Sequence, residues 1–236
     1  ANLPEPTIGP NSATQADDHF NILIYDGNDD ATRTFDVGFV SDFSWFKARN
    51  ASGIGHQLYD SSRGVQKYLA SNTNNDEATN TEGVTSFNSS GLLAIGNSNF
   101  LNKSGRTHVL WNWKANGGTT TTNDASATSV GSIDSVIQAN TTAGFSIVTI
   151  TSQSSGTATV GHGLGVKPSW ILVKTRAVSD AWYVYHKDYG ATKYTMLNST
   201  NAVASSSGLF NDTEPTTSVF SLGSGFAGSN TYIFYC

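Results

Sequence analysis

The sequence has few charged residues and almost no cysteine. Only 13% of its 236 residues are charged, so Ser, Thr, Asn and Gly must cover most of the surface. A cytoplasmic enzyme usually relies on Lys and Glu for this purpose. The single cysteine, Cys236, allows no disulfide within the chain and no CxxC metal pair. An extracellular protein without disulfides fits a bacterial or bacteriophage origin, which is the expectation here.

Long apolar runs and targeting signals are also missing. No stretch approaches the roughly 20 apolar residues that cross a bilayer, so we predict no membrane insertion. The chain opens without a signal peptide or an initiator Met, which predicts a fragment of a longer protein. Prolines at positions 4, 6 and 10 predict that residues 1–18 form an extended N-terminal linker. The net charge of −5 and the scattered Lys and Arg exclude a nucleic-acid partner.

An internal duplication is the most informative pattern that is present. Four blocks of the first half recur in the same order in the second half, at offsets of 125, 127, 126 and 124 residues. The paired blocks include Phe20 with Phe145, Gly38 with Gly165, Tyr59 with Tyr185, and Thr107 with Thr231. Offsets that differ so little are hard to obtain by chance. They predict one repeat at 19–115 and a second at 143–236.

The segment between the repeats, 116–142, is rich in Gly, Thr, Asn and Ser and forms the predicted connector. The run of four threonines at 119–122 cannot support a core, so 116–128 is interpreted as a flexible linker. For 130–139 we favour a packed strand with Ile133, Val136 and Ile137 turned inward.

Strand patterns dominate both repeats. Apolar residues alternate in Phe20-Ile22-Ile24 and in Phe43-Trp45. The alternation at 109–113 places Trp111 and Trp113 on one face. Gly and Asn turns separate these segments, and the best helical candidate, 62–70, has a Gly and a β-branched residue in its repeat partner. We therefore predict an all-β fold of two tandem antiparallel β-sandwich repeats of jelly-roll type.

A search for catalytic chemistry finds no convincing site. The five histidines, at 19, 56, 108, 162 and 186, lack the spacing of a zinc site. The acidic segment 26–30 resembles a calcium loop, but its repeat partner at 152–156 carries no acid, so a solvated turn is favoured. The glycine-rich segment 161–165 opens no helix and is interpreted as a tight turn rather than a phosphate loop. We predict no catalytic, cofactor-binding or metal-binding residue, and hence a protein that is not an enzyme.

Tryptophans provide the remaining functional signal, since exposed Trp and Tyr rings stack on sugars. Trp45 and Trp170 lie in nearly equivalent strands and are expected in the interior. Trp113, Trp182 and Tyr183 are the candidate contacts with a glycan or a protein partner.

Six segments together resemble a known family of tandem β repeats. They are LPEPTIGPN at 3–11, FVSDFSWFKAR at 39–49, LYDSSRG at 58–64, WNWKA at 111–115, GHGLGVKP at 161–168 and WYVYHK at 182–187. This family occurs in tail-fibre-like and other virion structural proteins of marine bacteriophages. The resemblance covers essentially the whole chain. Ser41 departs from it, because the family usually has a proline there, as the second repeat has at Pro168.

The resemblance implies an extracellular virion component, with other virion proteins as partners and a homotrimer as the common state of such fibres. We therefore expect a non-enzymatic tail-fibre module that attaches the particle to a host-surface glycan or protein through many weak contacts. The alternative is a structural spacer or capsid-decorating protein that binds only virion proteins. A polysaccharide depolymerase is a third option, for which Asp60 with Glu77 or Glu82 would have to supply the two carboxylates.

Overall fold

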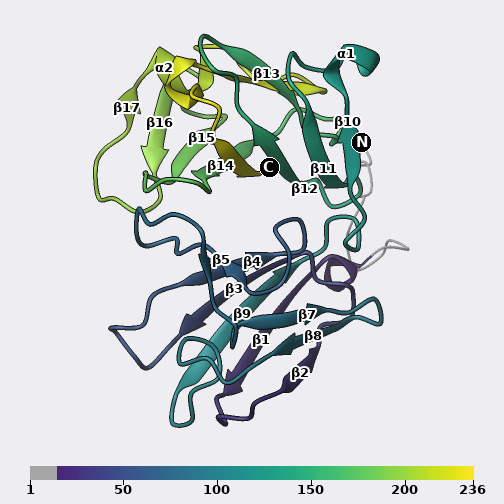
Figure 1. Ribbon diagram of the computed structural model, residues 1–236, viewed down its shortest axis with the longest axis vertical. Helices are drawn as coiled ribbons and strands as arrows, with labels where there is room; N and C mark the ends of the chain where they lie inside the picture. Colours follow the sequence, from purple (N-terminus) through teal and green to yellow (C-terminus); the bar gives the residue numbers. More distant parts are fainter. Residues whose placement is uncertain (1–14) are drawn as a thin grey trace, which may run out of the picture. The chain divides into compact units, whose positions relative to one another are not determined.

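The computed structural model describes residues 15–236 and shows an all-β protein. The chain forms two compact units (Figure 1). Unit 1 contains the chain up to Lys67 together with Thr79–Gly118, and unit 2 contains Tyr68–Ala78 and Thr119–Cys236. One short segment of the first half of the chain therefore belongs to unit 2. The predicted boundaries at 115 and 143 place this segment in the first repeat instead.

Unit 1 is a β-sandwich of a four-stranded and a three-stranded antiparallel sheet. The larger sheet has the order β1-β9-β3-β4 and the smaller one β2-β8-β7. Its elements are η1 (Ala16–Asp18), β1 (Phe20–Asp26), β2 (Arg33–Asp36), β3 (Phe43–Ala48), β4 (Gln57–Asp60), β7 (Val84–Phe87), β8 (Leu92–Ile95) and β9 (Thr107–Trp113). Strands β5 (Lys67–Tyr68) and β6 (Ala78–Thr79) pair where the chain passes between the units.

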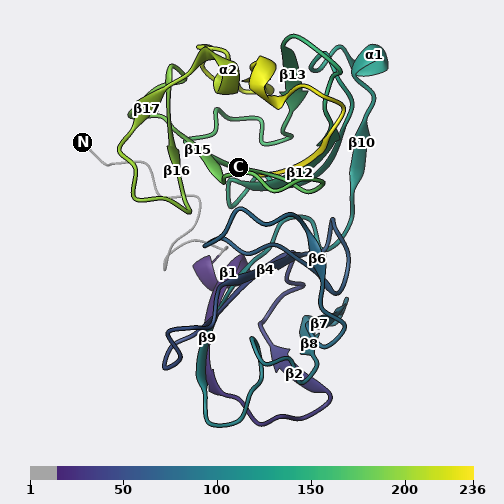
Figure 2. The same cartoon turned by 60° about the vertical axis from the view of Figure 1, so that its left-hand side comes forward.

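Alternating burial along the strands creates the core of unit 1. In β9 the side chains of His108, Leu110 and Asn112 are buried, whereas their neighbours are half-buried. The buried set faces the smaller sheet, where Tyr25 of β1 meets Phe35 of β2 with ring centroids 4.5 Å apart. Figure 2 separates the layer of β1 and β9 from that of β2, β7 and β8.

Unit 2 contains an eight-stranded sheet, β10-β11-β12-β19-β14-β15-β16-β17, and a two-stranded sheet, β13-β18. Its strands are β10 (Thr121–Asn123), β11 (Ser135–Asn140), β12 (Phe145–Thr151), β13 (Ala158–Gly161), β14 (Trp170–Thr175), β15 (Tyr183–His186), β16 (Lys193–Met196), β17 (Ala204–Ser205), β18 (Val219–Leu222) and β19 (Thr231–Tyr235). Short helical turns are α1 (Ala125–Thr128), α2 (Ser207–Phe210) and η2 (Ser224–Phe226). Aromatic side chains join the layers, with Phe220 and Phe234 ring centroids 4.8 Å apart.

The two units pair their central strands in the same way. The order β1-β9-β3-β4 of unit 1 matches β12-β19-β14-β15 of unit 2. The register matches too, because Trp111 lies opposite Ile22 and Trp45, and Tyr235 lies opposite Ile147 and Leu172. These pairs are related by the offsets of 125, 124 and 127 residues found in the sequence. Positions related in this way are called equivalent below.

The predicted flexible linker at 116–128 differs from the structure. Residues of this stretch form β10 and α1, and Asp124 caps α1 by accepting bonds from the backbone of Ser126 and Ala127. A cap and a strand partner give this polar stretch order that its composition does not predict. The packed strand predicted at 130–139 agrees with β11 from Ser135 onward, where Ile137 is buried. Residues 130–134 are not in a strand, and Ile133 and Val136 are half-buried.

The N-terminal linker prediction can be compared only in part. Residues 1–14 lie outside the described residues, and 16–18 form the 3-10 turn η1 rather than extended chain. The segment 62–70 is not helical, as expected. At Ser41, the position equivalent to Pro168, the hydroxyl lies 2.9 Å from Ser44 Oγ and 3.1 Å from Asn112 Oδ1. Ser41 is thus part of a buried polar network that proline could not complete.

Candidate functional site

The outer side of the large sheet of unit 1 carries two cross-strand rows of apolar side chains. The first row is Phe20–Trp113–Phe43 and the second is Ile22–Trp111–Trp45, running across β1, β9 and β3. Residues opposite one another in neighbouring strands point to the same side. We call these six residues the aromatic face.

This face is partly accessible. Ile22 is 49% exposed, and Phe20, Trp45, Trp111 and Trp113 are half-buried, whereas Phe43 is buried. Ile24, the next outward residue of β1, is 65% exposed. Contiguous exposed apolar residues on a protein surface commonly mark a binding site.

Tilted and edge-to-face ring contacts hold the rings of the aromatic face in place. Trp113 lies between Phe20 and Phe43, with ring centroids 4.9 and 5.1 Å away. Trp45 and Trp111 meet at 6.3 Å with an interplanar angle of 74°. The rings are therefore preorganised, so binding a ligand would cost the protein little side-chain entropy. The face is stepped rather than flat, because the two indoles are nearly perpendicular.

A polar contact fixes the orientation of Trp45. Its Nε1 donates to His56 Nδ1 at 2.8 Å, which places the imidazole proton on Nε2. Burial and the nearby Lys47 ammonium lower the pKa of His56. The imidazole is thus neutral at pH 7 and retains its acceptor role toward Trp45.

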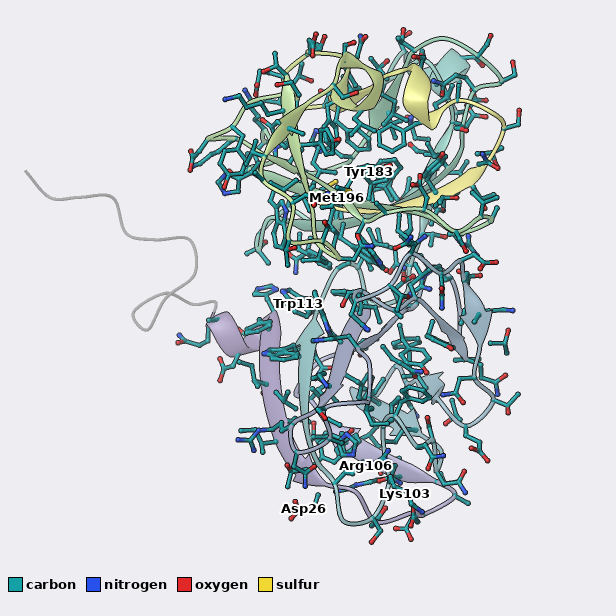
Figure 3. All side chains as sticks on the ribbon, turned by 90° about the vertical axis from the view of Figure 1, so that its left-hand side faces the viewer. Asp26, Lys103, Arg106, Trp113, Tyr183 and Met196 are labelled. Carbon is teal, nitrogen blue, oxygen red and sulfur yellow. The ribbon has the colours of Figure 1, made fainter. Side chains whose placement is uncertain are left out.

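Of the three predicted contact residues, Trp113 alone lies on the aromatic face (Figure 3). Trp182 was expected at the surface, and this is wrong, because the side chain is fully buried in unit 2. Its Nε1 donates to Ala70 O at 2.9 Å. The acceptor lies 112 residues earlier in the chain, in the segment that unit 2 receives from the first half.

Tyr183 is half-buried and packs against the core of unit 2. Its ring meets Phe226, its hydroxyl donates to Asp180 Oδ1 at 3.0 Å, and it lies opposite Met196 (Figure 3). Burial, followed by the Asp180 carboxylate, raises the pKa of Tyr183 to about 12. The hydroxyl and much of the ring therefore already have protein partners.

The two tryptophans expected in the interior are also placed differently. Trp170 is 48% exposed, at the first position of β14, and Trp45 is half-buried on the aromatic face. Both point outward from their sheets, as their strand partners show: Trp170 lies opposite His186, and Trp45 lies opposite Trp111. The alternation within β9 correctly grouped Trp111 with Trp113, and extending it across to β3 would have added Trp45.

In unit 2 the segment Tyr68–Ala78 covers part of the equivalent side of the sheet. Lys174 Nζ donates to Asn74 O at 3.0 Å, and the Arg176 guanidinium donates two bonds to the Glu77 carboxylate at 2.9 and 3.0 Å. Glu77 N returns a bond to Arg176 O at 3.0 Å. These contacts and the Trp182 bond hold the segment against β14 and the loop that follows it.

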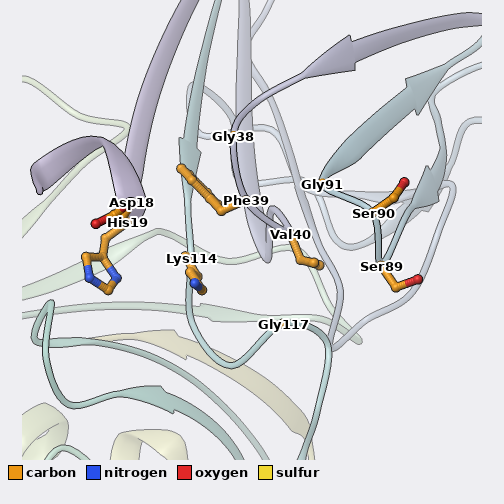
Figure 4. A pocket seen from close by; sticks show the side chains of 10 residues that line it. All are labelled: Asp18, His19, Gly38, Phe39, Val40, Ser89, Ser90, Gly91, Lys114 and Gly117. Carbon is orange, nitrogen blue, oxygen red and sulfur yellow. The ribbon is translucent and has the colours of Figure 1, made fainter. Parts of the chain in front are cut away.

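A second feature of unit 1 is an open hollow of about 530 Å³ (Figure 4). Asp18, His19 and Lys114 contribute polar side chains to it, and segments near Phe39 and Gly91 form the rest. None of the six residues of the aromatic face lines the hollow. We therefore treat the hollow as separate from the aromatic face.

The acidic and glycine-rich motifs have structural partners. Asp29, in the calcium-like turn, forms an exposed ion pair with Lys103 at 3.0 Å. His162, in the glycine-rich turn, is buried, and its Nδ1 accepts a bond from Leu164 N. Within residues 15–236, no group of three or more His, Cys, Asp or Glu side chains is arranged to hold a metal ion.

Two of the three carboxylates considered for a depolymerase are engaged as well. Asp60 forms a fully buried ion pair with Arg63, and Glu77 pairs with Arg176.

The described residues include no helix of the length and apolar character needed to span a membrane.

A family model for a domain of unknown function, DUF7483, matches residues 15–236. The chain belongs to this family. Neither the curated proteins nor the solved structures provide a match to it. For the DUF7483 domain, the aromatic face of unit 1 is the candidate site with the strongest physical basis, because its rings are ordered, grouped and accessible.

Proposed function

We propose that this DUF7483 domain is a non-enzymatic virion-surface module, built from two copies of a jelly-roll-like unit, that attaches a bacteriophage to a host-surface glycan. The observation that carries the proposal is the aromatic face, where three half-buried tryptophans are held by neighbouring rings. Such rings bind sugars by stacking, and many copies on one particle multiply a weak affinity. The polar, charge-poor composition and the resemblance to marine-phage tail-fibre repeats support an extracellular virion location.

The test is binding of the fluorescently labelled chain to candidate marine host cells, with and without added host polysaccharide. We expect saturable binding that the polysaccharide abolishes and that the double variant W45A/W111A loses. Trp170→Ala is the matched control, because it removes an exposed indole away from the aromatic face. Binding that is absent even for a multivalent display, or that depends on Trp170 instead, would contradict the proposal.

A structural spacer or capsid-decorating role is the second candidate. The observation in its favour is the pair Ile22 and Ile24, which are 49% and 65% exposed beside the aromatic rings. Branched aliphatic side chains offer a sugar no stacking surface but suit an apolar protein contact. Retention on purified virions, together with no affinity for host cells, would favour this role.

A further inference from the structure

A loop contact within unit 2 has an unoccupied counterpart elsewhere in the molecule. The segment Tyr68–Ala78 lies between the paired strands β5 and β6 and rests on Lys174 and Arg176. Strands β16 and β17 are the equivalent pair, with Lys193 opposite Ser205 at the same offset of 126 residues. The loop at 194–204 is therefore the equivalent of Tyr68–Ala78.

This second loop presents apolar side chains to solvent. Leu197 is 37% exposed and Val203 is 39% exposed. Asn198 anchors one end of the loop, since its Oδ1 accepts a bond from Trp182 N at 2.9 Å. The loop is thus held at its base. Residues 200–203 are exposed, and Ser199 is half-buried.

The surface that would receive it lies on unit 1, at Ile24, Lys47 and Arg49, which we call the receptor corner. These residues are equivalent to Thr149, Lys174 and Arg176. The backbone agrees as well, because Arg49 N donates to Thr107 O at 2.7 Å and Arg176 N to Thr231 O at 2.8 Å. Within residues 15–236, Arg49 is exposed and has no ion-pair partner.

On both sides of the contact, a polar residue in unit 2 corresponds to an apolar residue in the proposed contact. In unit 2 the loop brings Glu77 toward Arg176, and Arg176 and Thr149 line the same hollow. The loop at 194–204 has Val203 in place of Glu77, and the receptor corner has Ile24 in place of Thr149. A polar contact is therefore matched by an apolar one. The bond from Lys174 reaches a main-chain carbonyl, which any residue offers. Lys47 Nζ donates to Ile54 O within unit 1, and its ammonium has further N–H donors for the equivalent Thr200 O.

We propose that the loop at 194–204 of one copy docks on the receptor corner of a second copy. The two surfaces are different, so each bound copy still has one open loop or one open corner. Association of this kind is head to tail, and it continues as a filament or closes as a ring according to the rotation between copies. It uses Ile24, Lys47 and Arg49 and leaves the rows of the aromatic face for a host ligand. Self-assembly and host attachment can therefore each fail without the other.

Sedimentation analysis of the intact chain from micromolar to millimolar concentration tests the proposal. We expect the average mass to rise with concentration beyond that of a dimer. Ile24→Lys and Val203→Lys should each weaken association about tenfold or more, because each would bury a further cation beside Lys47 and Arg49. Both positions are exposed, so the fold should persist. Val166→Lys, at a 55% exposed site elsewhere, is the matched control and should associate like wild type.

A mixture of the two variants gives the decisive result. The Val203→Lys chain retains an intact corner, and the Ile24→Lys chain retains an intact loop. Mixed in equal amounts, they should form dimers that stop growing, although neither associates alone. A wild-type chain that remains monomeric throughout, or variants that associate as wild type does, would overturn the proposal. A mixture that stays monomeric would overturn the loop-to-corner pairing.

Discussion

The outer side of the central strands is open in unit 1 and covered in unit 2, although the strands pair in the same order. Ile22 is 49% exposed, whereas its equivalent, Ile147, is fully buried. Trp111 is half-buried, and its equivalent, Tyr235, is 6% exposed. The side chains are similarly apolar in both units, so local composition does not decide which face is accessible. Part of the difference comes from Tyr68–Ala78, which unit 2 receives from the first half of the chain.

The largest effect is expected from removing the side chain of Trp182, which anchors the covering segment Tyr68–Ala78. Trp182→Ala should lower the free energy of unfolding by about 3–5 kcal/mol, the usual cost of deleting a fully buried large aromatic side chain. It should also speed amide exchange in Tyr68–Ala78, since the bond to Ala70 O is lost. Urea unfolding and hydrogen exchange by mass spectrometry measure the two effects.

The control is His56→Ala, at the equivalent position of unit 1, where no such segment is bound. It should cost about 1 kcal/mol or less, because the imidazole is only half-buried. Equal losses for the two variants, or unchanged exchange in Tyr68–Ala78, would show that Trp182 does not anchor the segment.

The turn after the fourth central strand gives a second contrast. In unit 1, Asp60 and Arg63 form an ion pair whose side chains are fully buried, and Arg63 Nη2 also donates to Leu58 O at 2.8 Å. The equivalents in unit 2 are His186 and Tyr189, and Tyr189 is 45% exposed. Arg63→Met should destabilise the protein by about 3–5 kcal/mol, because the Asp60 carboxylate stays buried while the cation of the ion pair is removed.

Two variants test this explanation in urea unfolding. The double variant D60N/R63M should recover most of the lost stability, since no charge is then stranded. Tyr189→Ala should stay within about 0.5 kcal/mol of wild type. A double variant as unstable as Arg63→Met would indicate that packing of the Arg63 stem, rather than charge pairing, carries the effect.

Strand content could be predicted from sequence, because it depends on local alternation. The period-two pattern in 20–24 and 109–113 gives strands and groups Trp111 with Trp113. The offsets between the halves of the chain anticipated the matching registers. The order of 121–128 was missed because it depends on a cap and on a strand partner, Thr121 opposite Ile137, rather than on apolar content.

Only the part of the candidate site that lies within a single strand could be predicted from the sequence. Trp113 was identified, but Trp182 was placed at the surface because no sequence pattern shows that a segment 112 residues away covers it. Trp170 was assigned to the interior because a continuous apolar run suggests burial on both sides, whereas the first residue of β14 is 48% exposed. Burial of an outward-facing residue depends on distant chain, which local patterns cannot report.

Acid should distinguish the two cores through His108, whose equivalent in unit 2 is Tyr232. Burial, and then the cationic Arg106 and Arg33, lower the pKa of His108 to about 4. Between pH 6.5 and 4 the unfolded chain therefore binds a proton that the folded chain does not. The free energy of unfolding should fall over this range by up to about 3 kcal/mol, with no contribution from His108 above pH 6.5.

The measurement is urea unfolding as a function of pH, for wild type and His108→Tyr. The variant copies the residue of unit 2, so its stability should fall less steeply between pH 6.5 and 4. His162 contributes in the same direction, because burial lowers its pKa too, and some slope should remain. Parallel pH profiles for the two proteins would show that His108 is not the source.

The smallest expected effect concerns the ion pair between Arg176 and Glu77, which helps to hold the covering segment. Arg176→Ala removes two bonds to the Glu77 carboxylate, in a partly buried pair, and should cost about 1–2 kcal/mol. Arg49→Ala, at the equivalent and exposed position of unit 1, should change stability by less than about 0.5 kcal/mol in dilute solution. Urea unfolding of the two variants compares a receptor position that is occupied with one that is open. If Arg49→Ala became costly only at concentrations where the chain self-associates, the open corner would be occupied there by a second copy.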